Sequence, residues 1–437
     1  MDTKFDRIAK VAKEKPDEKL TSLIHLINKE TLIGCHNKMA LNKAAGVDGE
    51  TKAKYNENIE DNLDKLLLRM KNQSYKPQPV KRTYIPKGKD GVRPLGIPAY
   101  EDKLVQSATA NILTAIYEQD FLECSFGYRP NRSAHDALAL LSKIVNKPKI
   151  EYVVDTDIKG FFDNMSHEWL VKFLEHRISD KNLIRLIQRM LKAGVTENGI
   201  KTPTKVGAPQ GGSISPILAN IYLHYVLDIW FEKIVRKRCK GKAYMVRFAD
   251  DGVFCFEKDE ESRKFYDELI LRLDKFGLEV SKEKTKIVRL TKDDKDDDGN
   301  KPTFDFLGFT HYIGKSKIGK YEVTRRTSQK KFTQSLKNCK EWMKNNRILP
   351  VKVFMKELNR KLVGYCNYYA VTGNSTKLRD YLDKCRSLIF KWLNRRSQKR
   401  SFNWDKYVIF LKKYPLPKGT IKVHLWKMTK GLSYLSE

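Results

Sequence analysis

The sequence predicts an α+β protein whose C-terminal third is helical. Two strand-like apolar segments, 152–157 and 244–251, end in aspartates, and an Asp-Gly turn joins two extended stretches within 81–96. In the C-terminal third, apolar residues recur at helical spacing along 351–365 and 378–392. A chain of 437 residues, of which 41% are hydrophobic, can bury a large core and is expected to divide into two or three domains.

The N-terminal part is expected to be mainly helical. Segment 17–72 has helical spacing of apolar residues, and the glycine-containing stretch 44–49 interrupts it. One apolar stripe in this segment consists of Ile59, Leu63, Leu66, Leu67 and Met70. A β-hairpin should follow, with strands at 81–87 and 92–96 around the turn 88–91, because Asp-Gly is a strong hairpin signal.

Helices and short strands follow one another through the middle of the chain. A helix should begin at Ser215, with that residue as the N-cap and Pro216 in the first turn. The glycine-rich loop 207–212 before it is free to approach a ligand closely. The other expected elements are helices at 101–119, 134–145 and 259–276, and strands at 278–280, 286–288 and 304–309.

The adjacent carboxylates Asp250 and Asp251 are the strongest functional signal. They follow an apolar strand and precede a glycine, so Asp250-Asp251-Gly252 is expected to form a tight hairpin turn. Two carboxylates on a rigid turn suit Mg²⁺, which takes oxygen ligands and leaves places for water and phosphate. For an isolated Asp-Asp pair, an ordinary turn is the more common explanation.

A second acidic strand favours the metal site. Asp157 ends this strand, and two-metal phosphoryl transfer needs carboxylates from different strands to converge on ions about 3.5–4 Å apart. Asp155 and Asp163 have more ordinary explanations, as a polar residue at a strand edge and as part of the turn before a helix. We therefore expect Asp157 to join the Asp-Asp pair, and the other two aspartates not to be ligands.

The charge of the chain indicates a phosphate-rich partner. Lys and Arg number 85 against 53 Asp and Glu, which gives a formal net charge of +32 and a field that attracts polyanions. Residues 311–437 contain 31 Lys and Arg but only 7 Asp and Glu, with aromatic residues interleaved at 365–369 and 390–396. This third is a nucleic-acid-binding candidate; a solvated helix face is the alternative for its charges, and some of its aromatic residues must be core.

The sequence gives no sign of secretion or membrane insertion. Its charged start is not followed by an apolar stretch, and no apolar run approaches the roughly 18 residues that a membrane span needs. The seven cysteines are far apart and form no Cys-x-x-Cys pair, so we expect reduced and mostly buried thiols. We expect a cytoplasmic protein without a membrane partner.

Seven ordered blocks of the sequence resemble those of group II intron reverse transcriptases/maturases of bacterial type. The blocks are 46–49, 85–87 with 93–98, 126–133, 157–163, 209–212 with 215–216, 248–251 and 306–309. Segment 358–369 also resembles the maturase-type thumb of this family, called domain X. The resemblance covers nearly the whole chain.

This resemblance implies a right-hand polymerase fold. Fingers and a palm with an antiparallel sheet would be followed by an all-α thumb, the maturase domain X. The implied domains are an N-terminal helical extension at 1–75, reverse transcriptase fingers and palm at 76–312, the thumb at 313–396 and a basic C-terminal appendix at 397–437.

The resemblance also implies the residues of the polymerase site. Asp157, Asp250 and Asp251 would be catalytic and would hold two Mg²⁺ ions. Lys87 and Arg93 would grip the triphosphate of the incoming dNTP, with Arg offering bidentate contacts and Lys a point charge. A solvated hairpin is the alternative for these two cations.

Three further residues would contact the dNTP. Phe161 would lie under the sugar and exclude a ribose 2′-hydroxyl, with Phe162 as the alternative and core packing possible for either. Gln210 would approach the nucleotide from its glycine-rich loop, and Lys284 would lie near the leaving pyrophosphate or else on the surface. The expected nucleic-acid contacts are Arg129, Asn131, Arg360, Lys361, Lys391, Arg395 and Arg396.

Two features depart from the family pattern. Phe248 stands where many relatives have tyrosine, which we expect to be tolerated. The C-terminus shows no Cys-x-x-Cys and His/Asn-rich pattern of the HNH endonuclease found in some relatives, so DNA cutting is not expected.

The expected function is RNA-directed DNA polymerisation of group II intron type. The implied partners are an RNA template/primer duplex, group II intron RNA with assistance to splicing, and a DNA target. The alternatives are a maturase that acts chiefly as an RNA-binding splicing factor, or a host-adopted reverse transcriptase in defence or DNA repair. An RNA-dependent RNA polymerase is less favoured, because Phe161 would oppose ribonucleotides and Ala249 rather than Gly precedes the aspartates.

Overall fold

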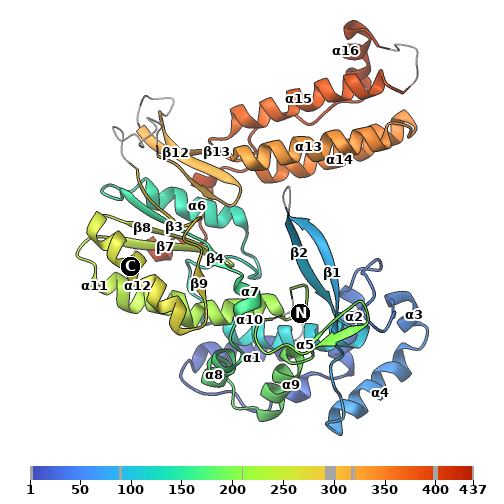
Figure 1. Cartoon of the computed structure of the whole chain (residues 1–437), viewed down its shortest axis with the longest axis vertical. Helices are drawn as coiled ribbons and strands as arrows, with labels where there is room; N and C mark the ends of the chain where they lie inside the picture. The colour runs from blue at the N-terminus through green and yellow to red at the C-terminus, as the bar shows by residue number, and fades with distance from the viewer. Residues whose placement is uncertain are drawn as a thin grey trace. The chain divides into compact units, whose positions relative to one another are not determined.

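The computed structural model divides the chain into two compact units (Figure 1). The first comprises Met1–Ser133, Thr156–Gly252 and Glu260–Thr285, and the second comprises Ala134–Asp155, Val253–Asp259 and Lys286–Glu437. The structure describes residues 3–87, 91–208, 210–290, 302–315, 319, 321–396 and 402–435. The α+β prediction is confirmed, and each unit contains both helices and strands.

The N-terminal part of the first unit is helical, as predicted. It contains α1 (Thr3–Glu14), α2 (Lys29–Lys38), α3 (Lys52–Asn56) and α4 (Ile59–Lys71). Asn28 begins α2, and its side chain accepts a hydrogen bond from the Thr31 N–H over 3.0 Å, which satisfies one of the free amides of the first turn. Leu63 and Leu66 of the predicted stripe are completely buried.

The core of the first unit is built around α5 (Tyr100–Tyr117) and α10 (Ser215–Leu223). Helix α10 continues through two π-helical turns, η2 (His224–Asp228) and η3 (Phe231–Val235), into α11 (Arg236–Arg238). Ser215 is the first helical residue, and the N-cap is Ile214, so the predicted cap was one residue too late. Pro216 lies in the first turn, as predicted.

The predicted hairpin is present in the first unit. Strands β1 (Val80–Lys87) and β2 (Gly91–Ile97) pair antiparallel, whereas residues 88–90 of the predicted turn lie outside the described residues. Two strands that the sequence did not indicate, β5 (Val195–Glu197) and β6 (Ile200–Thr202), extend this sheet in the order β2-β1-β5-β6.

The remaining elements of the first unit follow the strand before Asp157 along the chain or lie on either side of the Asp250-Asp251 turn. They are β4 (Ile158–Lys159), α7 (Phe161–Asn164), α8 (His167–Arg177), α9 (Lys181–Leu191), β7 (Ala243–Phe248), α12 (Asp259–Lys275) and β9 (Glu279–Val280). Strand β4 pairs antiparallel with β9. This pairing brings the chain after the first acidic strand next to the segment that contains Lys284.

The second unit contains the predicted acidic strand β3 (Tyr152–Thr156) and helix α6 (Ala134–Val145). Strand β3 lies between β8 (Asp251–Phe256) and β10 (Lys286–Arg289), and β10 runs antiparallel to it. A second antiparallel sheet consists of β11 (Phe304–Phe306), β12 (Phe309–Lys315) and β13 (Tyr321–Thr327). The segment between 313 and 327, expected to begin the helical thumb, is therefore partly a hairpin.

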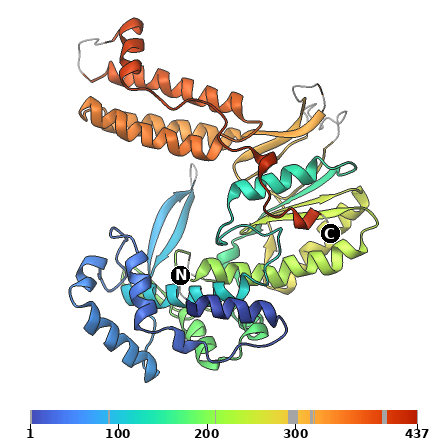
Figure 2. The same cartoon turned by 180° about the vertical axis from the view of Figure 1, so that it is seen from behind.

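Three long helices follow this hairpin. Helices α13 (Gln329–Asn346), α14 (Val351–Tyr369) and α15 (Ser375–Leu393) pack side by side in both views (Figures 1 and 2), and α16 (Trp404–Lys413) follows. The two predicted stripes face their core: Phe354 and Leu358 of α14, like Leu378 and Ile389 of α15, are at most 1% exposed.

The segment after α16 runs back to α6 within the second unit (Figure 2). Val423 pairs with Val371 in a parallel bridge, and its carbonyl accepts from the Thr372 N–H over 3.0 Å. Leu425 is completely buried, and the Lys143 ammonium of α6 donates to the Met428 carbonyl. The basic appendix is thus anchored to the second unit through Val423, Leu425 and Met428, whereas 397–401 lie outside the described residues.

All seven cysteines are free, and six of them are buried, as predicted. Cys339 of α13 and Cys385 of α15 are in contact, with their Sγ atoms 3.7 Å apart. Among the described residues, no helix combines the length and the apolar character needed to cross a membrane.

Candidate active site

The three predicted aspartates lie at strand ends. Asp157 follows β3 directly, Asp250 lies in the turn between β7 and β8, and Asp251 is the first residue of β8. Asp157 and Asp250 are half-buried, whereas Asp251 is exposed. The turn is formed by Ala249 and Asp250, one residue earlier than predicted, because Ala249 takes the left-handed conformation at φ +57°.

Asp157 and Asp250 lie close enough for their charges to interact. Burial raises the pKa of Asp250, and the negative charge of Asp157 raises it further. Hydrogen bonding to backbone and the positive charges of Arg93 and Arg247 act in the opposite direction. A bound cation would stabilise the ionised form of a buried carboxylate such as Asp250, whose neighbour is also negative.

The donor set fits a hard divalent cation only in part. Asp157 and Asp250 supply carboxylate oxygens from two different strand ends, which are the ligands that Mg²⁺ prefers. Within the part of the chain that the structure describes, no three His, Cys, Asp or Glu side chains are close enough together to hold a metal. Of the three predicted ligands, Asp157 and Asp250 interact electrostatically, and Asp250 and Asp251 both act on Tyr128.

Lys284 faces Asp157 directly. Its ammonium lies 2.8 Å from Oδ2 of that carboxylate, and its side chain remains 64% exposed. The neighbouring backbone fixes this geometry, since the Ser281 N–H donates to the Asp157 carbonyl over 2.8 Å. The sequence placed Lys284 near the leaving pyrophosphate or on the surface; in the structure it pairs with the Asp157 carboxylate and stays exposed.

The turn that carries Asp250 is braced by a buried arginine that the sequence analysis did not single out. Arg247 is completely buried and donates from Nη1 to the Ala249 carbonyl over 2.8 Å. Its Nε and Nη2 donate to the two carboxylate oxygens of Asp228 over 2.7 and 2.6 Å. Ser125 Oγ at 2.8 Å and Asn220 Oδ1 at 3.2 Å accept from the same guanidinium.

A tight backbone contact supports the same turn from the segment before α6. A Cβ atom on Gly127 would lie 2.2 Å from the Ala249 amide nitrogen, so only glycine fits there. The Gly127 carbonyl accepts from Asn220 Nδ2 over 2.7 Å, which links this segment to the arginine network. A charged residue inside the apolar strand Ala243–Phe248 and an aspartate inside an apolar helix were the signals that could have revealed the network.

Tyr128, the residue after Gly127, also belongs to the site. Its side chain is 52% exposed, and burial of its hydroxyl and the charges of Asp250 and Asp251 raise its pKa, while Arg93 opposes the shift. Arg93 itself is exposed on β2, opposite Ile85. The structure therefore brings one predicted triphosphate ligand into the field of the carboxylates; the side chain of the other, Lys87, lies outside the described atoms.

The glycine-rich loop before α10 is held between β2 and α7. The Gln210 carbonyl accepts from the Gly96 N–H over 2.6 Å, and the Ala208 N–H donates to the Phe162 carbonyl over 2.8 Å. Gly211, at φ +112°, would place a Cβ atom 2.8 Å from the Gly96 carbonyl oxygen. At this position the glycine permits close approach to protein backbone. Gln210 is thereby fixed, with a half-buried side chain.

Phe161 is 2% exposed, so most of its ring is packed inside the protein. Its centroid lies 5.3 Å from that of Phe162 and 6.2 Å from that of Tyr222. Phe162 is half-buried, and it therefore offers more accessible ring surface than Phe161.

Arg129 does not have the surroundings of a nucleic-acid ligand. Its side chain is 2% exposed, pairs with Glu118 at 2.8 Å and donates to the Leu122 and Ser125 carbonyls over 2.6 and 2.8 Å. The hydrogen bonds of this arginine stabilise the loop that follows α5. Asn131, by contrast, is exposed and has a left-handed backbone at φ +58°.

The other expected nucleic-acid contacts lie on the helices of the second unit. Arg360 and Lys361 are exposed on α14, and Lys361 lies over the Trp342 ring at 5.3 Å. Lys391 and Arg395 are exposed at the end of α15, whereas Arg396 donates to the Leu349 carbonyl over 2.6 Å and is half-buried.

Comparison with known proteins identifies two matching regions. Residues 85–311 match the family Reverse transcriptase (RNA-dependent DNA polymerase), and residues 330–409 match the Group II intron, maturase-specific domain. Group II intron-encoded protein LtrA of Lactococcus lactis subsp. cremoris is 39% identical over 222 residues, which cover 50% of this chain and 37% of LtrA. Protein YkfC of Escherichia coli (strain K12) is 32% identical over 225 residues, which cover 50% of this chain and 59% of YkfC.

The matched part spans less than two thirds of each of these relatives. A structure of telomerase from Candida albicans with a fragment of telomeric RNA is a distant likeness, with a TM-score of 0.42 and 15% identity over 83% of this chain and 65% of that one. The reverse transcriptase match covers half of the chain, begins in the hairpin β1-β2 and includes all three aspartates. The chain therefore belongs to the reverse transcriptase family, and it carries the maturase-specific domain of group II intron proteins.

Proposed function

We propose that this protein is an RNA-directed DNA polymerase of group II intron type. The observation that carries the proposal is the convergence of Asp157 and Asp250 from two strand ends, with Arg93 in the same electrostatic field. A protein that only bound RNA would have no chemical use for Asp250, a carboxylate that burial and the neighbouring Asp157 make costly to ionise. Reverse transcriptases use divalent metal ions, and we assign two Mg²⁺ ions to this site.

The chain's own residues supply ligands and positioning. Asp157 and Asp250 would hold the ions, with Asp251 contributing from the first residue of β8. When bound, Mg²⁺ makes the primer 3′-hydroxyl a better nucleophile and neutralises charge on the phosphates. The 3′ oxygen then bonds to the α-phosphorus of the dNTP as the bond to pyrophosphate breaks.

The remaining site residues would act on the nucleotide. Arg93 and Lys87 would bind the triphosphate, where a guanidinium gives bidentate contacts. Lys284, whose side chain is largely exposed beside Asp157, would be able to reach the pyrophosphate oxygens with its ammonium. Phe161 or the more accessible Phe162 would select deoxyribose, and Gln210 would approach the nucleotide from its anchored loop.

The helices of the second unit would bind RNA. We assign a template/primer duplex and a group II intron RNA as partners, with splicing assistance as an accompanying role and a DNA target for insertion. Arg360, Lys361, Lys391 and Arg395 present exposed cations for phosphate contacts. Such contacts suit A-form RNA, which is recognised mainly by shape and backbone.

Primer extension tests the proposal. Wild-type protein should extend a DNA primer on an RNA template with Mg²⁺ and dNTPs but not with ribonucleotides, and Asp250→Asn should abolish extension. Asp163→Asn is the matched control, because Asp163 is an exposed carboxylate near the site to which we assign no metal contact. Absence of extension by folded, RNA-binding wild type would refute the polymerase and favour a maturase that acts as a splicing factor. Loss of activity in both variants would show that the assay does not report on the metal site.

A further inference from the structure

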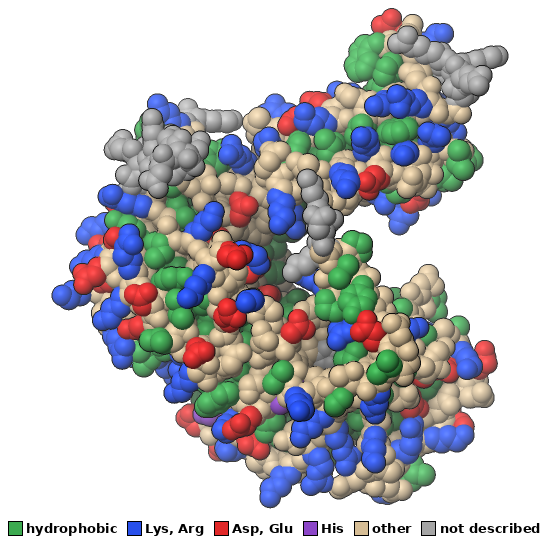
Figure 3. All heavy atoms as spheres, in the orientation of Figure 1, with side chains coloured by type: hydrophobic (Ala, Val, Ile, Leu, Met, Phe, Trp, Pro, Cys, Tyr) green, Lys and Arg blue, Asp and Glu red, His purple; other side chains and the backbone are tan. Residues whose placement is uncertain are grey.

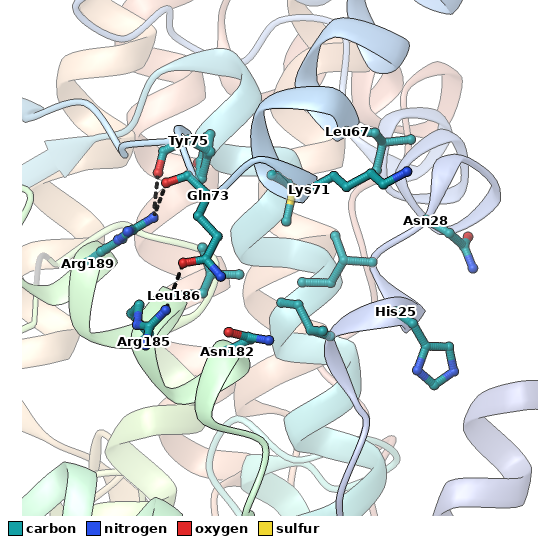
Figure 4. Close-up of a pocket in the computed structure, with 13 residues that line it drawn as sticks. His25, Asn28, Leu67, Lys71, Gln73, Tyr75, Asn182, Arg185, Leu186 and Arg189 are labelled. Carbon is teal, nitrogen blue, oxygen red and sulfur yellow. Dashed lines mark hydrogen bonds between the residues drawn. The ribbon is translucent and has the colours of Figure 1, made fainter.

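A cavity of about 380 Å³ lies in the first unit, away from the residues of the polymerase site. It is formed by α4, α9 and the segment around η1 (Ile24–Leu26) (Figure 4). Its floor is apolar: Ile27 and Leu186 are 5% and 6% exposed, and Leu67 and Met70 of α4 are half-buried. This floor offers a flat, planar ligand the apolar surface that small-molecule sites provide.

The wall of the cavity is held in place by α9. Figure 4 shows Arg185 and Arg189 reaching from this helix toward Gln73. Arg185 donates to the Gln73 side-chain carbonyl over 2.8 Å, and Arg189 donates to the main-chain carbonyls of Gln73 and Tyr75 over 3.0 and 3.1 Å. Gln73 has a left-handed backbone at φ +56°, which these contacts stabilise. The cavity is therefore formed before any ligand arrives.

The rim combines positive charge with amide groups. Lys71, Arg185 and Arg189 line the cavity, and of the described residues that line it none is Asp or Glu. The two arginines contact carbonyls rather than carboxylates, so these contacts leave their charge uncompensated. Lys and Arg side chains also gather on the surface around α4 and α9 in Figure 3. An anionic ligand is therefore favoured electrostatically.

The amide groups narrow the chemistry of that ligand. Asn28, Gln73 and Asn182 line the cavity. The oxygens of Asn28 and Gln73 already accept from Thr31 and Arg185, so these two residues offer their NH₂ donors, and Asn182 offers both a donor and an acceptor. An apolar floor, amides at its edge and cations on the rim correspond to the three parts of a nucleotide: the face of a base, its hydrogen-bonding edge and a phosphate. An acidic peptide would pair with the cations, but it would bring no flat ring for the apolar floor and no base edge for the amides.

We propose that this cavity binds one unpaired nucleotide of an RNA ligand, with the base on the apolar floor and its two flanking phosphates on Lys71 at one side and on Arg185 and Arg189 at the other (Figure 4). The proposal rests on the proposed function only in taking RNA as the partner. Sequence-specific recognition of RNA mostly targets unpaired bases, because a helix hides the base edges. The cavity thus gives the N-terminal helices a role in recognition that does not involve the polymerase site.

Two pairs of variants of the full chain on the same helix test this proposal. Leu67→Trp fills the cavity without changing charge, and Leu68→Trp is its control, because Leu68 is 58% exposed and does not line the cavity. Lys71→Gln removes a rim charge, and Lys65→Gln is its control, because Lys65 lies outside the cavity and pairs with Asp61 at 2.6 Å. The probe is a short single-stranded RNA that contains one 4-thiouridine.

Affinity, its salt dependence and the crosslinked peptide are the readouts. Leu67→Trp should weaken binding about tenfold with an unchanged salt slope, because it removes a base contact. Lys71→Gln should reduce the slope of log K against log salt by about 0.7, the value for one phosphate on a single strand. Wild-type crosslinks should map to peptides around Gln73 and α9, and both controls should resemble wild type.

Equal binding by all four variants, or crosslinks elsewhere in the chain, would overturn the proposal. Equal affinity for single-stranded DNA of the same sequence would overturn its restriction to RNA. If Leu67→Trp does not fold, the Lys71/Lys65 pair and the crosslink map decide alone. Primer extension by the same proteins separates this test from the proposed function. Cavity variants that lose the nucleotide contact should still extend an annealed primer. An inactive wild type would refute the proposed polymerase activity and leave the RNA-binding proposal standing.

Discussion

Removing the charge of Arg247 should destabilise the protein and disable the turn that carries Asp250. The guanidinium and the Asp228 carboxylate are both completely buried and share two hydrogen bonds of 2.7 and 2.6 Å. In Arg247→Met, the apolar stem of the side chain is kept and the guanidinium is lost, so Asp228 is left as an uncompensated buried charge. Breaking a buried ion pair in this way costs about 3–5 kcal/mol, so the free energy of unfolding in urea should fall by about that amount.

A double variant separates the charge effect from the bracing of the turn. In Arg247→Met/Asp228→Leu both charges are gone, and apolar replacement of a whole buried pair is often neutral or better, so most of the lost stability should return. Polymerisation should not return, because the Ala249 carbonyl still lacks the donor that Arg247 provides at 2.8 Å. A single variant that costs less than about 1 kcal/mol, or a double variant that is no more stable than the single one, would refute this account of the network.

Three other substitutions give separate tests. Asp250→Asn should raise the melting temperature at neutral pH without metal, because the raised pKa of Asp250 means that its ionisation costs stability as pH rises. The gain should vanish below about pH 4, where the Asp and the Asn side chain are both neutral. A gain that persists there would contradict the electrostatic cause. Gly127→Ala should lower the free energy of unfolding in urea by about 1–3 kcal/mol and abolish primer extension, because its Cβ would lie 2.2 Å from the Ala249 nitrogen. Gly34→Ala in α2 is the control; this position has open space around it, so the substitution should be neutral or stabilising. Arg129→Ala should lower stability by about 3 kcal/mol but leave the affinity of the folded protein for a template/primer duplex unchanged; a weakened affinity with intact stability would restore Arg129 as a nucleic-acid contact.

The sequence predicted the elements whose causes are local. The Asp-Gly signal located the hairpin β1-β2, and helical spacing located α4, α14 and α15, because each depends on residues that are neighbours in the chain. The convergence of Asp157 with Asp250 was also predictable, because both close apolar strands. The position of the turn was not, because the left-handed conformation of Ala249 is held by Arg247 and the close contact with Gly127, which come from tertiary packing.

Charge was a poor guide to exposure. Arg129 was expected to bind nucleic acid and Arg247 was given no role, yet both are buried with several hydrogen bonds each. Arg247 stands inside an apolar strand, which was a signal of burial, whereas the partners of Arg129, Glu118 and the carbonyls of Leu122 and Ser125, give no such pattern. In the C-terminal segment, Leu425 and Tyr434 are buried although they stand in a basic stretch without a periodic apolar pattern, so their burial could not be read from the sequence.

The return of that segment to α6 determines when the second unit can complete its folding during synthesis. Lys143 of α6 and its acceptor Met428 are 285 residues apart, so α6 has to wait for nearly the whole remaining chain. At about 5–20 residues per second, this delay is roughly 15 to 60 s. The first unit ends at Thr285, and β10, the last strand to pair with β3, ends at Arg289. On the ribosome, the strands that carry the carboxylates can therefore pair while the buried face of α6 still lacks its last partner, which leaves this helix open to misfolding and to chaperones.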